Sequence, residues 1–573
     1  MTFIRSLAVV SLTVVGLGTV FGFSTNETDE VYFRIPIYRI TDVDNLTRLI
    51  SIDDVRGDTV YAYATSEQMR QLRSLDYKVE LLPHPSSLFH HDMFDGRSTL
   101  LYEWDRYPTY QGYLGMMRQF AQDYPTICRL DTIGYSVQGR LLLAVKISDS
   151  VDVREDESRF LYTSTMHGDE TVGYVLLLRL IDYMLTNYGR ETPEGERITR
   201  LVNELEIWIN PLANPDGTYR LGGDTTVNNA RRYNANGIDL NRDFPDRVSD
   251  TNNTTANRQL ETQAMMRFAA KHNFTLSANF HGGAQVVNYP WDNGAPSGTY
   301  SASPDDAWFN ALSRVYAMPN ADIMSGGFTN GITNGCKWYA IFGGRQDWIY
   351  WWYGGRETTI ELWNTKNPAG SVLPQRWVNN KESLLTYMEG ALKGVRGTVV
   401  DGVPLAPLKA RIDIVGIPNA PVYSDSIRGG FSRLLLPGTY DLIVRASGYQ
   451  ADTLRQVVVT NRYATHVDMT LKQSQTSAQN SVQCPEVDLR LLQSHPNPFN
   501  PRTAIRFSVA ERQAVSLTVH DLLGREIAVL VDEQKEPGTY EVTWDGASHP
   551  SAVYFCRLRT AGFAATRKLV LMK

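Results

Sequence analysis

The stretch FLYTSTMHGDETVGYVLLLRLIDYML (residues 160–185) decides the fold class of this chain. Its first seven residues form an apolar run typical of a buried strand, and residues 171–185 have the length and apolar content of a buried helix. Strand-like runs recur at 141–148, 205–210, 274–280 and 358–363, with another helical segment at 260–272. Such alternation predicts an α/β domain with a mixed sheet of the eight-stranded type, flanked by helices.

The regions on either side of this α/β domain, which we place at about 96–393, predict further domains. Residues 24–95 combine strand-like runs with one helical segment, so they predict a small α/β domain or pro-domain that ends in a linker. After 393, short strands separated by Gly and Pro turns predict a β-sandwich at 394–472. A polar linker at 473–488 then leads to a second all-β, Ig-like module at 489–573.

Composition and charge exclude several classes of protein. The 573 residues are 42% hydrophobic and only 21% charged, which is too few charges for a disordered chain. A net charge of -6 without a basic stripe argues against nucleic acid as a partner. The four cysteines, Cys128, Cys336, Cys484 and Cys556, are too scattered to predict a disulfide framework, and none stands in a CxxC pair that could bind zinc.

The N-terminus predicts export from the cytosol. Arg5 precedes an apolar run at 7–23, and a polar segment follows, which is the pattern of a signal peptide over residues 1–23. Ser, Thr and Gly residues interrupt this run, so we expect no stable transmembrane span.

A His and a Glu stand three residues apart between the first strand and helix of the quoted stretch. We expect His167 to end the strand and Glu170 to begin the helix, so that both side chains can reach one metal ion. Such a pair is a weak signal by itself, because a lone His at a strand end is more often structural. A third candidate, His281, follows the strand-like run 274–280 and precedes two glycines. Three protein ligands with a fourth position left for water are typical of zinc hydrolases.

Further motifs accompany these three residues. They are NPDG at 214–217, RYNANGIDLNR at 232–242, WY at 338–339, GG at 343–344 and TIEL at 359–362. Their order resembles the zinc carboxypeptidase family, and within it the regulatory branch of carboxypeptidases N, E, M and D. The resemblance covers about residues 97–472. It implies the zinc carboxypeptidase fold, followed by a transthyretin-like sandwich at 394–472.

The resemblance also implies roles for individual residues. One catalytic Zn²⁺ would be held by His167, Glu170 and His281, and Asp239 would orient a ligand His. Glu361 would be the general base, because Tyr339 precedes it by 22 positions, as the mobile tyrosine does in the family. The remaining implied roles are stabilisation of the oxyanion by Arg232 and binding of the terminal carboxylate of the substrate by Asn241, Arg242 and Tyr339.

One site departs from the family pattern, and one segment has two possible interpretations. Ala230 and Arg231 stand where the family usually has Gly before the oxyanion Arg, so Arg231 is a weaker candidate for the role of Arg232. The aromatic run at 348–353 is consistent with core packing or with a hydrophobic rim of the cleft.

Substrate specificity is implied by two residues found by counting. Asp292 lies 11 residues after His281, where the regulatory branch carries its acidic specificity residue, and Gln346 lies seven after Tyr339, where that branch has Gln. Since a buried carboxylate requires a cation, we predict a preference for C-terminal Arg or Lys. The alternative is that Asp292 is a solvated loop residue.

The tail resembles the C-terminal sorting domain of type IX secretion in Bacteroidetes-like bacteria. The matching segments are SHPNPFNP at 494–501, VHDLLGREIAVL at 519–530, GTYEVTWDG at 538–546 and RKLVLMK at 567–573. The resemblance implies export through the periplasm of a Gram-negative-type bacterium to its surface or medium, with the type IX machinery as a partner. An adhesive β-sandwich is the alternative.

The sequence therefore predicts a secreted zinc metallocarboxypeptidase that acts on the C-termini of peptides or proteins, and we expect a monomer. One alternative is a carboxypeptidase for cell-wall peptides, since diaminopimelate also carries an amine. Another is a catalytically silent scaffold that binds at a surface. The sequence leaves open whether residues 24–95 inhibit the enzyme or only add structure.

Overall fold

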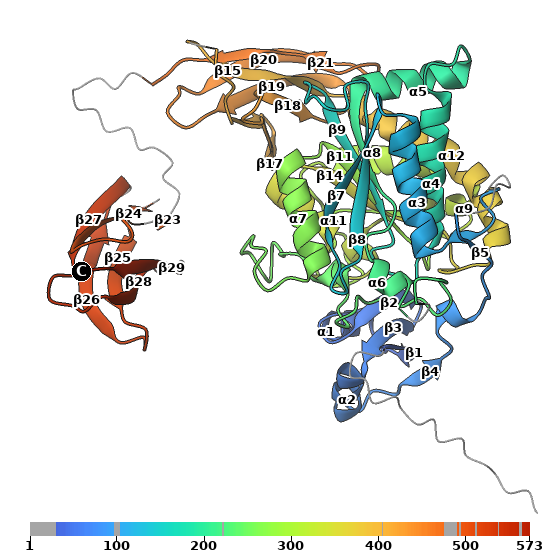
Figure 1. Cartoon of the computed structure of the whole chain (residues 1–573), viewed down its shortest axis with the longest axis horizontal. Coiled ribbons are helices and arrows are strands. Elements are labelled where there is room, and N and C mark those ends of the chain that lie inside the picture. Colours follow the sequence, from blue (N-terminus) through green and yellow to red (C-terminus); the bar gives the residue numbers. More distant parts are fainter. Residues whose placement is uncertain are drawn as a thin grey trace, which may run out of the picture. The chain divides into compact units, whose positions relative to one another are not determined.

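The computed structural model describes residues 30–96, 103–220, 223–403, 405–474, 490–491, 494, 496–509, 513–536, 538–560 and 564–573. The chain divides into two compact units, Met1–Ser474 and Gln475–Lys573 (Figure 1). The predicted signal peptide at 1–23 and nearly all of the predicted linker at 473–488 lie outside the described residues.

An eight-stranded mixed sheet forms the centre of the first unit, which confirms the predicted α/β class. In sheet order the strands are β13 (Ile332–Asn334), β12 (Val286–Tyr289), β14 (Arg356–Glu361), β11 (Leu276–His281), β9 (Ser158–Ser164), β10 (Leu205–Asn210), β8 (Leu141–Ile147) and β7 (Cys128–Tyr135). The four central strands β14, β11, β9 and β10 are parallel. Every residue of β9, β10 and β11 is buried, as expected for parallel strands covered on both faces.

Helices cover the two faces of this sheet. They are α3 (Tyr110–Asp123), α4 (Val172–Asn187), α5 (Pro193–Glu204), α6 (Pro215–Thr218), α7 (Leu260–His272), α8 (Asp306–Ala317), α9 (Ala321–Met324), α10 (Gly335–Trp338), α11 (Arg345–Tyr353) and α12 (Leu373–Glu389). Successive strand residues alternate between two cores, because side chains along a strand point to opposite faces. Phe160 and Ile207 pack with α3, α4, α5, α8 and α12, whereas Leu161 and Trp208 pack with α7 and α11.

Among the helices of the described segments, none has the length and apolar character needed to cross a bilayer.

The small N-terminal domain is an antiparallel sheet in the order β2-β3-β1-β4. Its elements are β1 (Glu30–Pro36), α1 (Val43–Leu46), β2 (Ser51–Arg56), β3 (Thr59–Thr65), α2 (Ser66–Ser74) and β4 (Glu80–Leu82). Thr65 caps α2, since its side chain accepts from the Gln68 N–H and the Gln68 side chain accepts from the Thr65 N–H. The sequence analysis did not predict β2, whose Asp53–Asp54 pair interrupts an apolar strand pattern.

The segment after β4 is more ordered than the predicted linker. The Ser86 hydroxyl donates to the Ala230 carbonyl at 2.6 Å, and the His91 ring nitrogen Nδ1 is 2.6 Å from the Asn228 amide oxygen. A two-residue strand, β5 (Met93–Phe94), pairs with β6 (Tyr107–Pro108). These polar contacts fix the segment against the large domain, although its sequence has no periodic apolar pattern.

Two β-sandwiches complete the chain. In the first unit, β15 (Val395–Asp401), β18 (Gly430–Arg433), β21 (Thr465–His466) and β22 (Met469–Leu471) form one sheet, and β16 (Arg411–Ile414), β17 (Ile417–Tyr423), β19 (Gly438–Arg445) and β20 (Asp452–Val459) form the other. In the second unit, the two sheets are β23 (Arg490–Leu491), β24 (Arg502–Val509) and β27 (Gly538–Asp545), and β25 (Gln513–His520), β26 (Glu526–Lys535), β28 (Ala552–Arg559) and β29 (Ala564–Leu571). Cys128, Cys336 and Cys556 are buried and unpaired among the described residues, whereas Cys484 lies outside them.

Candidate metal centre

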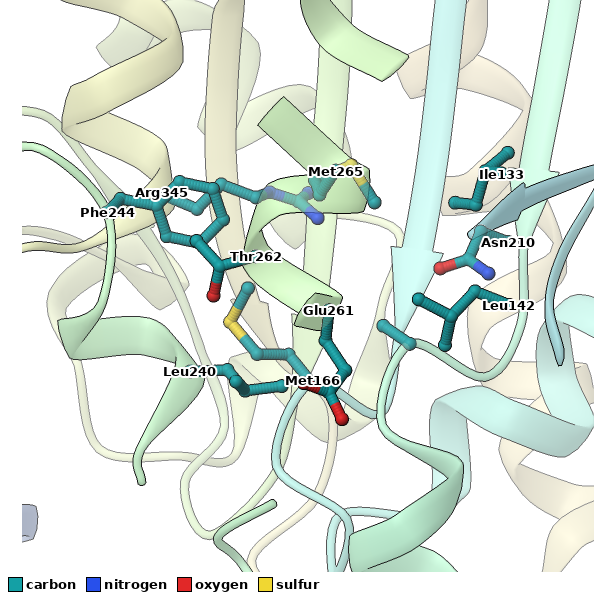
Figure 2. Close-up of a pocket in the computed structure, with 11 residues that line it drawn as sticks. Ile133, Leu142, Met166, Asn210, Leu240, Phe244, Glu261, Thr262, Met265 and Arg345 are labelled. Carbon is teal, nitrogen blue, oxygen red and sulfur yellow. The ribbon is translucent and has the colours of Figure 1, made fainter. Parts of the chain in front are cut away.

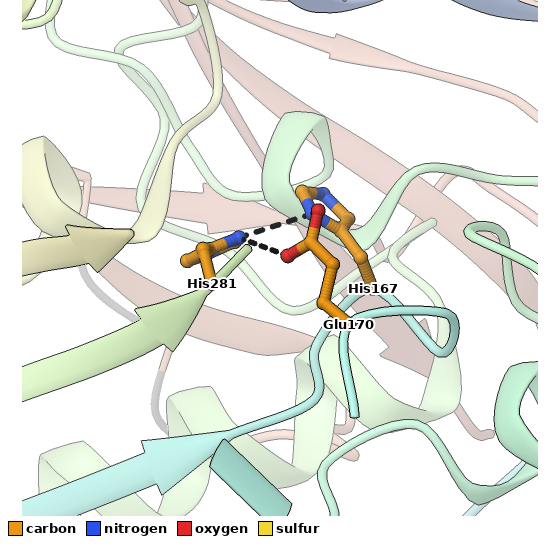
Figure 3. A group of neighbouring side chains, drawn as sticks. All are labelled: His167, Glu170 and His281. Atoms are coloured by element: carbon orange, nitrogen blue, oxygen red, sulfur yellow. Dashed lines mark hydrogen bonds and ion pairs between the residues drawn. The ribbon is translucent and has the colours of Figure 1, made fainter. Parts of the chain in front are cut away.

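The three predicted ligands converge at the carboxyl end of the central sheet (Figure 3). Nδ1 of His281 lies 2.9 Å from Glu170 Oε2 and 3.0 Å from His167 Nδ1. Nδ1 of His167 lies 3.1 Å from Glu170 Oε1. One donor atom from each residue lies within 4.8 Å of the others, so a single metal ion can contact all three.

The predicted positions of His167 and Glu170 were slightly wrong. β9 ends at Ser164 and α4 begins at Val172, so both ligands lie in the turn between these elements. Thr165 has a φ of 63°, which turns the chain away from the strand, and the Glu170 N–H donates to the His167 carbonyl at 3.1 Å. Gly168 allows a close approach here, because a Cβ on it would lie 2.4 Å from the Gly217 carbonyl carbon.

The other ring nitrogen of each His has a separate partner. Nε2 of His167 is 3.0 Å from Asp239 Oδ1, and Nε2 of His281 is 2.7 Å from the Asn279 amide nitrogen. Both Nδ1 atoms lie beside the Glu170 carboxylate, and a polar neighbour at Nε2 orients each ring. Burial lowers the pKa of His281 to about 4, which keeps that ring neutral. Two His rings and one carboxylate are a ligand set that suits Zn²⁺, so these residues fit the ion.

Glu361, the predicted general base, is the last residue of β14 and lies opposite His281 in the parallel register. Its Oε2 atom is buried and has no hydrogen-bond partner within the described residues. Burial, followed by the nearby charge of Glu170, raises the pKa of Glu361 well above its usual value. A carboxyl group with a raised pKa is suited to general acid–base work.

Two cations contact the carboxylate of Glu170. Nη1 of Arg232 donates to Glu170 Oε1 at 3.1 Å, and Nζ of Lys366 donates to the same atom at 2.8 Å. Although burial acts in the opposite direction, His167, Lys366 and His281 hold the pKa of Glu170 well below its usual value. Arg231 instead donates to the carbonyl of Asn229 at 3.1 Å in its own loop, so it lies outside the site.

Asn241, Arg242 and Tyr339 line the same cavity as the metal ligands. The Asn241 N–H donates to Asp239 Oδ1 at 2.8 Å, and its side-chain oxygen accepts from the Arg345 N–H at 3.0 Å, so both ends of this residue are fixed. Arg242 and Tyr339 donate to backbone carbonyls of β2 in the N-terminal domain. The predicted carboxylate-binding residues therefore lie together in one place.

Asp292 is buried rather than part of a solvated loop, with 2% of its surface exposed. Its Oδ1 accepts from Gln346 Nε2 at 3.0 Å and from Asn288 Nδ2 at 3.2 Å. Its N–H donates to Asp347 Oδ2 at 3.0 Å. Burial raises the pKa of Asp292 to about 7. No ion pair within the described residues joins Asp292 to a cation, so the carboxyl group can receive one from a ligand.

The cavity that these residues enclose has a free volume of only about 20 Å³. It is lined by Asp53, His167, Glu170, Arg232, Asn241, Arg242, His281, Gly282, Asn288, Asp292, Trp338, Tyr339, Ile341, Thr359 and Glu361. Gln346 and Asp239 lie behind this lining, where they contact Asp292 and His167. Among the described lining residues, none comes from the aromatic run 348–353, whose Trp348 is fully buried in a core. This favours the core-packing interpretation of the run.

Sequence reasoning missed three polar residues of this region, namely Asp53, Asp347 and Lys366. Lys366 follows Glu361 by five positions, but no local pattern marks it as buried. Asp53 was detectable only as one of two consecutive Asp residues within a strand.

A second cavity of about 20 Å³, drawn in Figure 2, lies among Met166, Leu240, Phe244, Met265 and Arg345 on the α7 side of the sheet. None of the predicted site residues is among the described residues that line it. The cavity is mostly apolar and its volume fits about one water molecule, so it is not the candidate site.

Comparisons with known proteins identify several similar chains. Residues 113–383 match the family model described as "Zinc carboxypeptidase". Carboxypeptidase M of Mus musculus is 38% identical over 360 residues, covering 60% of this chain and 79% of that protein. Carboxypeptidase D of Homo sapiens is 40% identical over 377 residues, covering 64% of this chain and 27% of that protein. The chain thus spans about a quarter of the length of carboxypeptidase D. The crystal structure of carboxypeptidase A from Helicoverpa armigera is 16% identical, covers 63% of this chain and 97% of that one, and has a TM-score of 0.47.

We expect Asp239→Asn to weaken zinc binding by roughly 10- to 100-fold, because the amide no longer presents a carboxylate to the His167 ring. Competition for zinc with a coloured chelator measures the change in Kd. Asp243→Asn, four residues along the chain and half-buried, is the matched control and should bind zinc as the native chain does. Equal zinc affinity in the Asp239 variant would contradict the assigned role.

Proposed function

Since this chain belongs to the zinc carboxypeptidase family, we propose that it is a zinc-dependent carboxypeptidase that removes C-terminal Arg or Lys from peptides or proteins. The observation that carries the proposal is one cavity that contains the three candidate ligands, the carboxyl group of Glu361 and the buried carboxyl group of Asp292. Each group matches one requirement of the reaction, namely metal binding, proton transfer and recognition of a basic side chain.

In the proposed reaction, His167, Glu170 and His281 would hold Zn²⁺, which would supply Lewis-acid chemistry for the scissile carbonyl and for the attacking water molecule. Glu361 accepts the proton of that water and later delivers it to the leaving amine. The raised pKa of Glu361 supports both halves of this transfer, because a group of low pKa would not return the proton. Arg232 supplies positive charge where the oxyanion forms.

Two groups of residues are assigned to recognise the C-terminal residue of the substrate, one through its terminal carboxylate and the other through its side chain. Asn241, Arg242 and Tyr339 bind the terminal carboxylate, since amide, guanidinium and phenol groups can all donate to its oxygens. Asp292 binds the guanidinium or ammonium of the side chain, and Gln346 fixes the orientation of Asp292 through their 3.0 Å hydrogen bond.

We expect the zinc-loaded protein, with its cleft accessible, to release Arg and Lys from a library of peptides with varied C-termini. Glu361→Gln should lower kcat/KM by about 10²- to 10⁴-fold while retaining zinc, because the amide cannot accept the proton of the water. Released amino acids are quantified by mass spectrometry, and zinc by elemental analysis. Glu191→Gln, on the surface, is the control. Release of diaminopimelate alone would favour cell-wall substrates, and no release from any peptide would favour the silent scaffold.

The pKa of Asp292 predicts a pH dependence of specificity. Below pH 7 this carboxyl group is largely protonated, and above pH 7 it is ionised and attracts a cation. The ratio of kcat/KM for a C-terminal Arg peptide to that for a C-terminal Leu peptide should therefore rise about tenfold between pH 6 and pH 8. The catalytic groups act on both peptides, so the effect of their ionisation on kcat/KM cancels in the ratio.

Asp292→Asn should make this ratio independent of pH and lower it by about 10²- to 10³-fold at pH 8, since the cation loses its buried partner. Asp250→Asn, on a surface loop, should leave the pH profile of the ratio unchanged. A pH-dependent ratio that persists in the Asp292 variant would assign the basic pocket to another carboxylate.

We also propose that the chain is exported and that residues 489–573 are a sorting domain for type IX secretion. The compact second unit, with its own apolar core, supports a module that folds separately from the enzyme. The transthyretin-like and Ig-like names for the two sandwiches belong to the same proposal.

A chain that ends at Ser474, the last residue of the first unit, should accumulate in the periplasm of a bacterium with type IX secretion. Immunoblots of periplasm, surface and medium measure the distribution, with the full chain as the control. Activity in the periplasmic extract shows whether the shortened enzyme is folded. Arrival of an active shortened chain outside the cell would identify the tail as an adhesive module instead.

A further inference from the structure

A larger cavity lies between the large α/β domain and the β-sandwich of the first unit, and we call it the interdomain cavity because residues of both line it. Its free volume is about 270 Å³, whereas that of the catalytic cavity is about 20 Å³, and the described linings of the two cavities share no residue. Pockets for small molecules are common at domain boundaries and start at roughly 300 Å³. We propose that the interdomain cavity binds an acidic sugar, which means a sugar ring or short glycan that carries carboxylate or sulfate groups.

Helices α7 and α11 place the interdomain cavity at the edge of the sheet opposite the metal centre. Lys271 lies in the last turn of α7, which leads into β11, and Tyr353 ends α11, which leads into β14. The far ends of these two strands carry His281 and Glu361. Each strand has six residues, so its two ends are about 17 Å apart at about 3.3 Å per residue. A ligand in this cavity therefore lies apart from the proposed place of peptide cleavage.

Buried ion pairs fix the two domains on either side of the cavity. Asp305, which precedes α8, accepts from Nη2 of Arg356 at 2.5 Å and from Nη2 of Arg433 at 2.6 Å. Arg356 belongs to β14 and Arg433 to β18 of the sandwich, and all three side chains are at most 2% exposed. A shift of the sandwich would leave buried charges without partners, which is costly. The cavity is therefore formed before a ligand binds.

Three cations line the cavity, and two of them are available to an anion. Nη2 of Arg154 lies 3.4 Å from Oδ2 of Asp425, which is the one carboxylate among the described lining residues. Lys271 and Lys409 are exposed and form no ion pair within the described residues. Two ammonium groups without counterions attract a carboxylate or sulfate, and charge-assisted hydrogen bonds to such groups are stronger than neutral ones.

The carboxylate of Asp425 does not neutralise these lysines, because other groups already bind both of its oxygens. Besides Arg154, Oδ2 has Nη1 of Arg159 at 3.5 Å. Oδ1 accepts from the N–H groups of Ile427 at 2.9 Å and Arg428 at 2.8 Å. The cavity thus keeps a surplus of positive charge.

Aromatic rings form another part of the lining. Trp352 and Tyr353 come from α11, Tyr423 ends β17, and all three residues are partly exposed. The apolar C–H groups of a sugar ring can pack on an aromatic face, while its hydroxyl groups require hydrogen bonds. Within the described residues, the indole N–H of Trp352 and the hydroxyls of Tyr423 and Ser426 have no hydrogen-bond partner, so they can bond to a sugar.

The ends of the two helices favour a ligand with hydroxyl groups over a phosphate. The lining includes C-terminal residues of both α7 and α11, and the last carbonyls of a helix lack intrahelical partners. Sugar hydroxyls can donate to such carbonyls, but a fully ionised phosphate has no donor and prefers a helix N-terminus. Among the described lining residues, none is a glycine that would bring backbone N–H groups close to a phosphate.

The edge of the sandwich disfavours an acidic peptide as the ligand. β17 is an edge strand of the sheet β17-β16-β19-β20 and ends at the cavity with Tyr423. Two of its residues, Pro418 and Pro421, have no N–H group, so an extended peptide cannot add a regular strand along it. The cations, aromatic rings and hydrogen-bonding groups of the cavity therefore fit an acidic sugar best.

Calorimetric titration of the intact, zinc-loaded chain tests the proposal. The probes are trigalacturonate, which carries carboxylates, a sulfated galactan trisaccharide, and neutral maltotriose. We expect the acidic sugars to bind at least about tenfold more tightly than maltotriose, because two lysines attract their charge. Such binding of either acidic sugar supports the proposal, and their relative affinities show which acidic group the cavity prefers.

Variants of the lining locate the bound sugar. Lys271→Gln and Lys409→Gln should each raise Kd for the acidic sugars about fivefold and leave that for maltotriose unchanged, since only a charge is removed. Trp352→Ala should weaken the binding of all three sugars. Lys472→Gln is the matched control, since it changes an exposed lysine of the chain that does not line the cavity. Circular dichroism and zinc content check that each variant is folded.

Three results would overturn the proposal. They are no binding of either acidic sugar, equal affinity for acidic and neutral sugars, and unchanged affinity for the acidic sugars in both lysine variants. AMP and acetylated tetra-aspartate are titrated for comparison. If either binds more tightly than both acidic sugars and loses affinity in the lysine variants, the cavity is a site for phosphates or acidic peptides, and the assignment to sugars is wrong.

Discussion

Parallel hydrogen bonding between β11 and β14 places His281 directly beside Glu361, and the parallel partner of β11 on its other side, β9, leads into the turn with His167 and Glu170. Three segments that are far apart in the sequence therefore end at one edge of the sheet. The pairing places a candidate metal ligand and the proposed base at adjacent strand ends, which is where open α/β sheets bind ligands. The residues with the other proposed roles come from loops, and the positions of these loops depend on this edge of the central sheet.

Charge balance is the second constraint on the site. Glu170 and Asp239 are ionised although they are buried, since His167, Arg232 and other cations lower their pKa values. No cation of the described segments forms an ion pair with Glu361 or Asp292, and burial raises the pKa values of both. The site thus contains two kinds of carboxyl group. Glu170 and Asp239 are ionised and bonded to cations, whereas Glu361 and Asp292 can exchange a proton or accept a cation. Neighbouring acidic residues whose pKa values are shifted in opposite directions are typical of catalytic sites.

Apolar runs and the motif series predicted the three candidate ligands, which the structure brings together, and the remaining roles stay predictions from the resemblance. The sequence placed β9 and the start of α4 only approximately, since the left-handed Thr165 and the close approach at Gly168 leave no periodic signal. It missed Lys366, whose importance depends on a contact with Glu170 across 196 positions. It also missed β2, because Asp53 and Asp54 make the strand look exposed. Asp53 is stabilised by two cations of the large domain, and Asp54 by Arg56 of the same strand.

The N-terminal domain contacts the cleft mainly through groups that water can also satisfy. Without β2, Arg232 and Lys366 would still pair with Glu170, and Arg242 would be hydrated. Tyr339 and Ile341 would lose apolar neighbours, but they border a cleft where a substrate packs. Within the described chain, no buried residue of the two cores that cover the sheet precedes Tyr107. The two cores that cover the sheet are therefore built, within the described chain, without buried residues of the N-terminal domain.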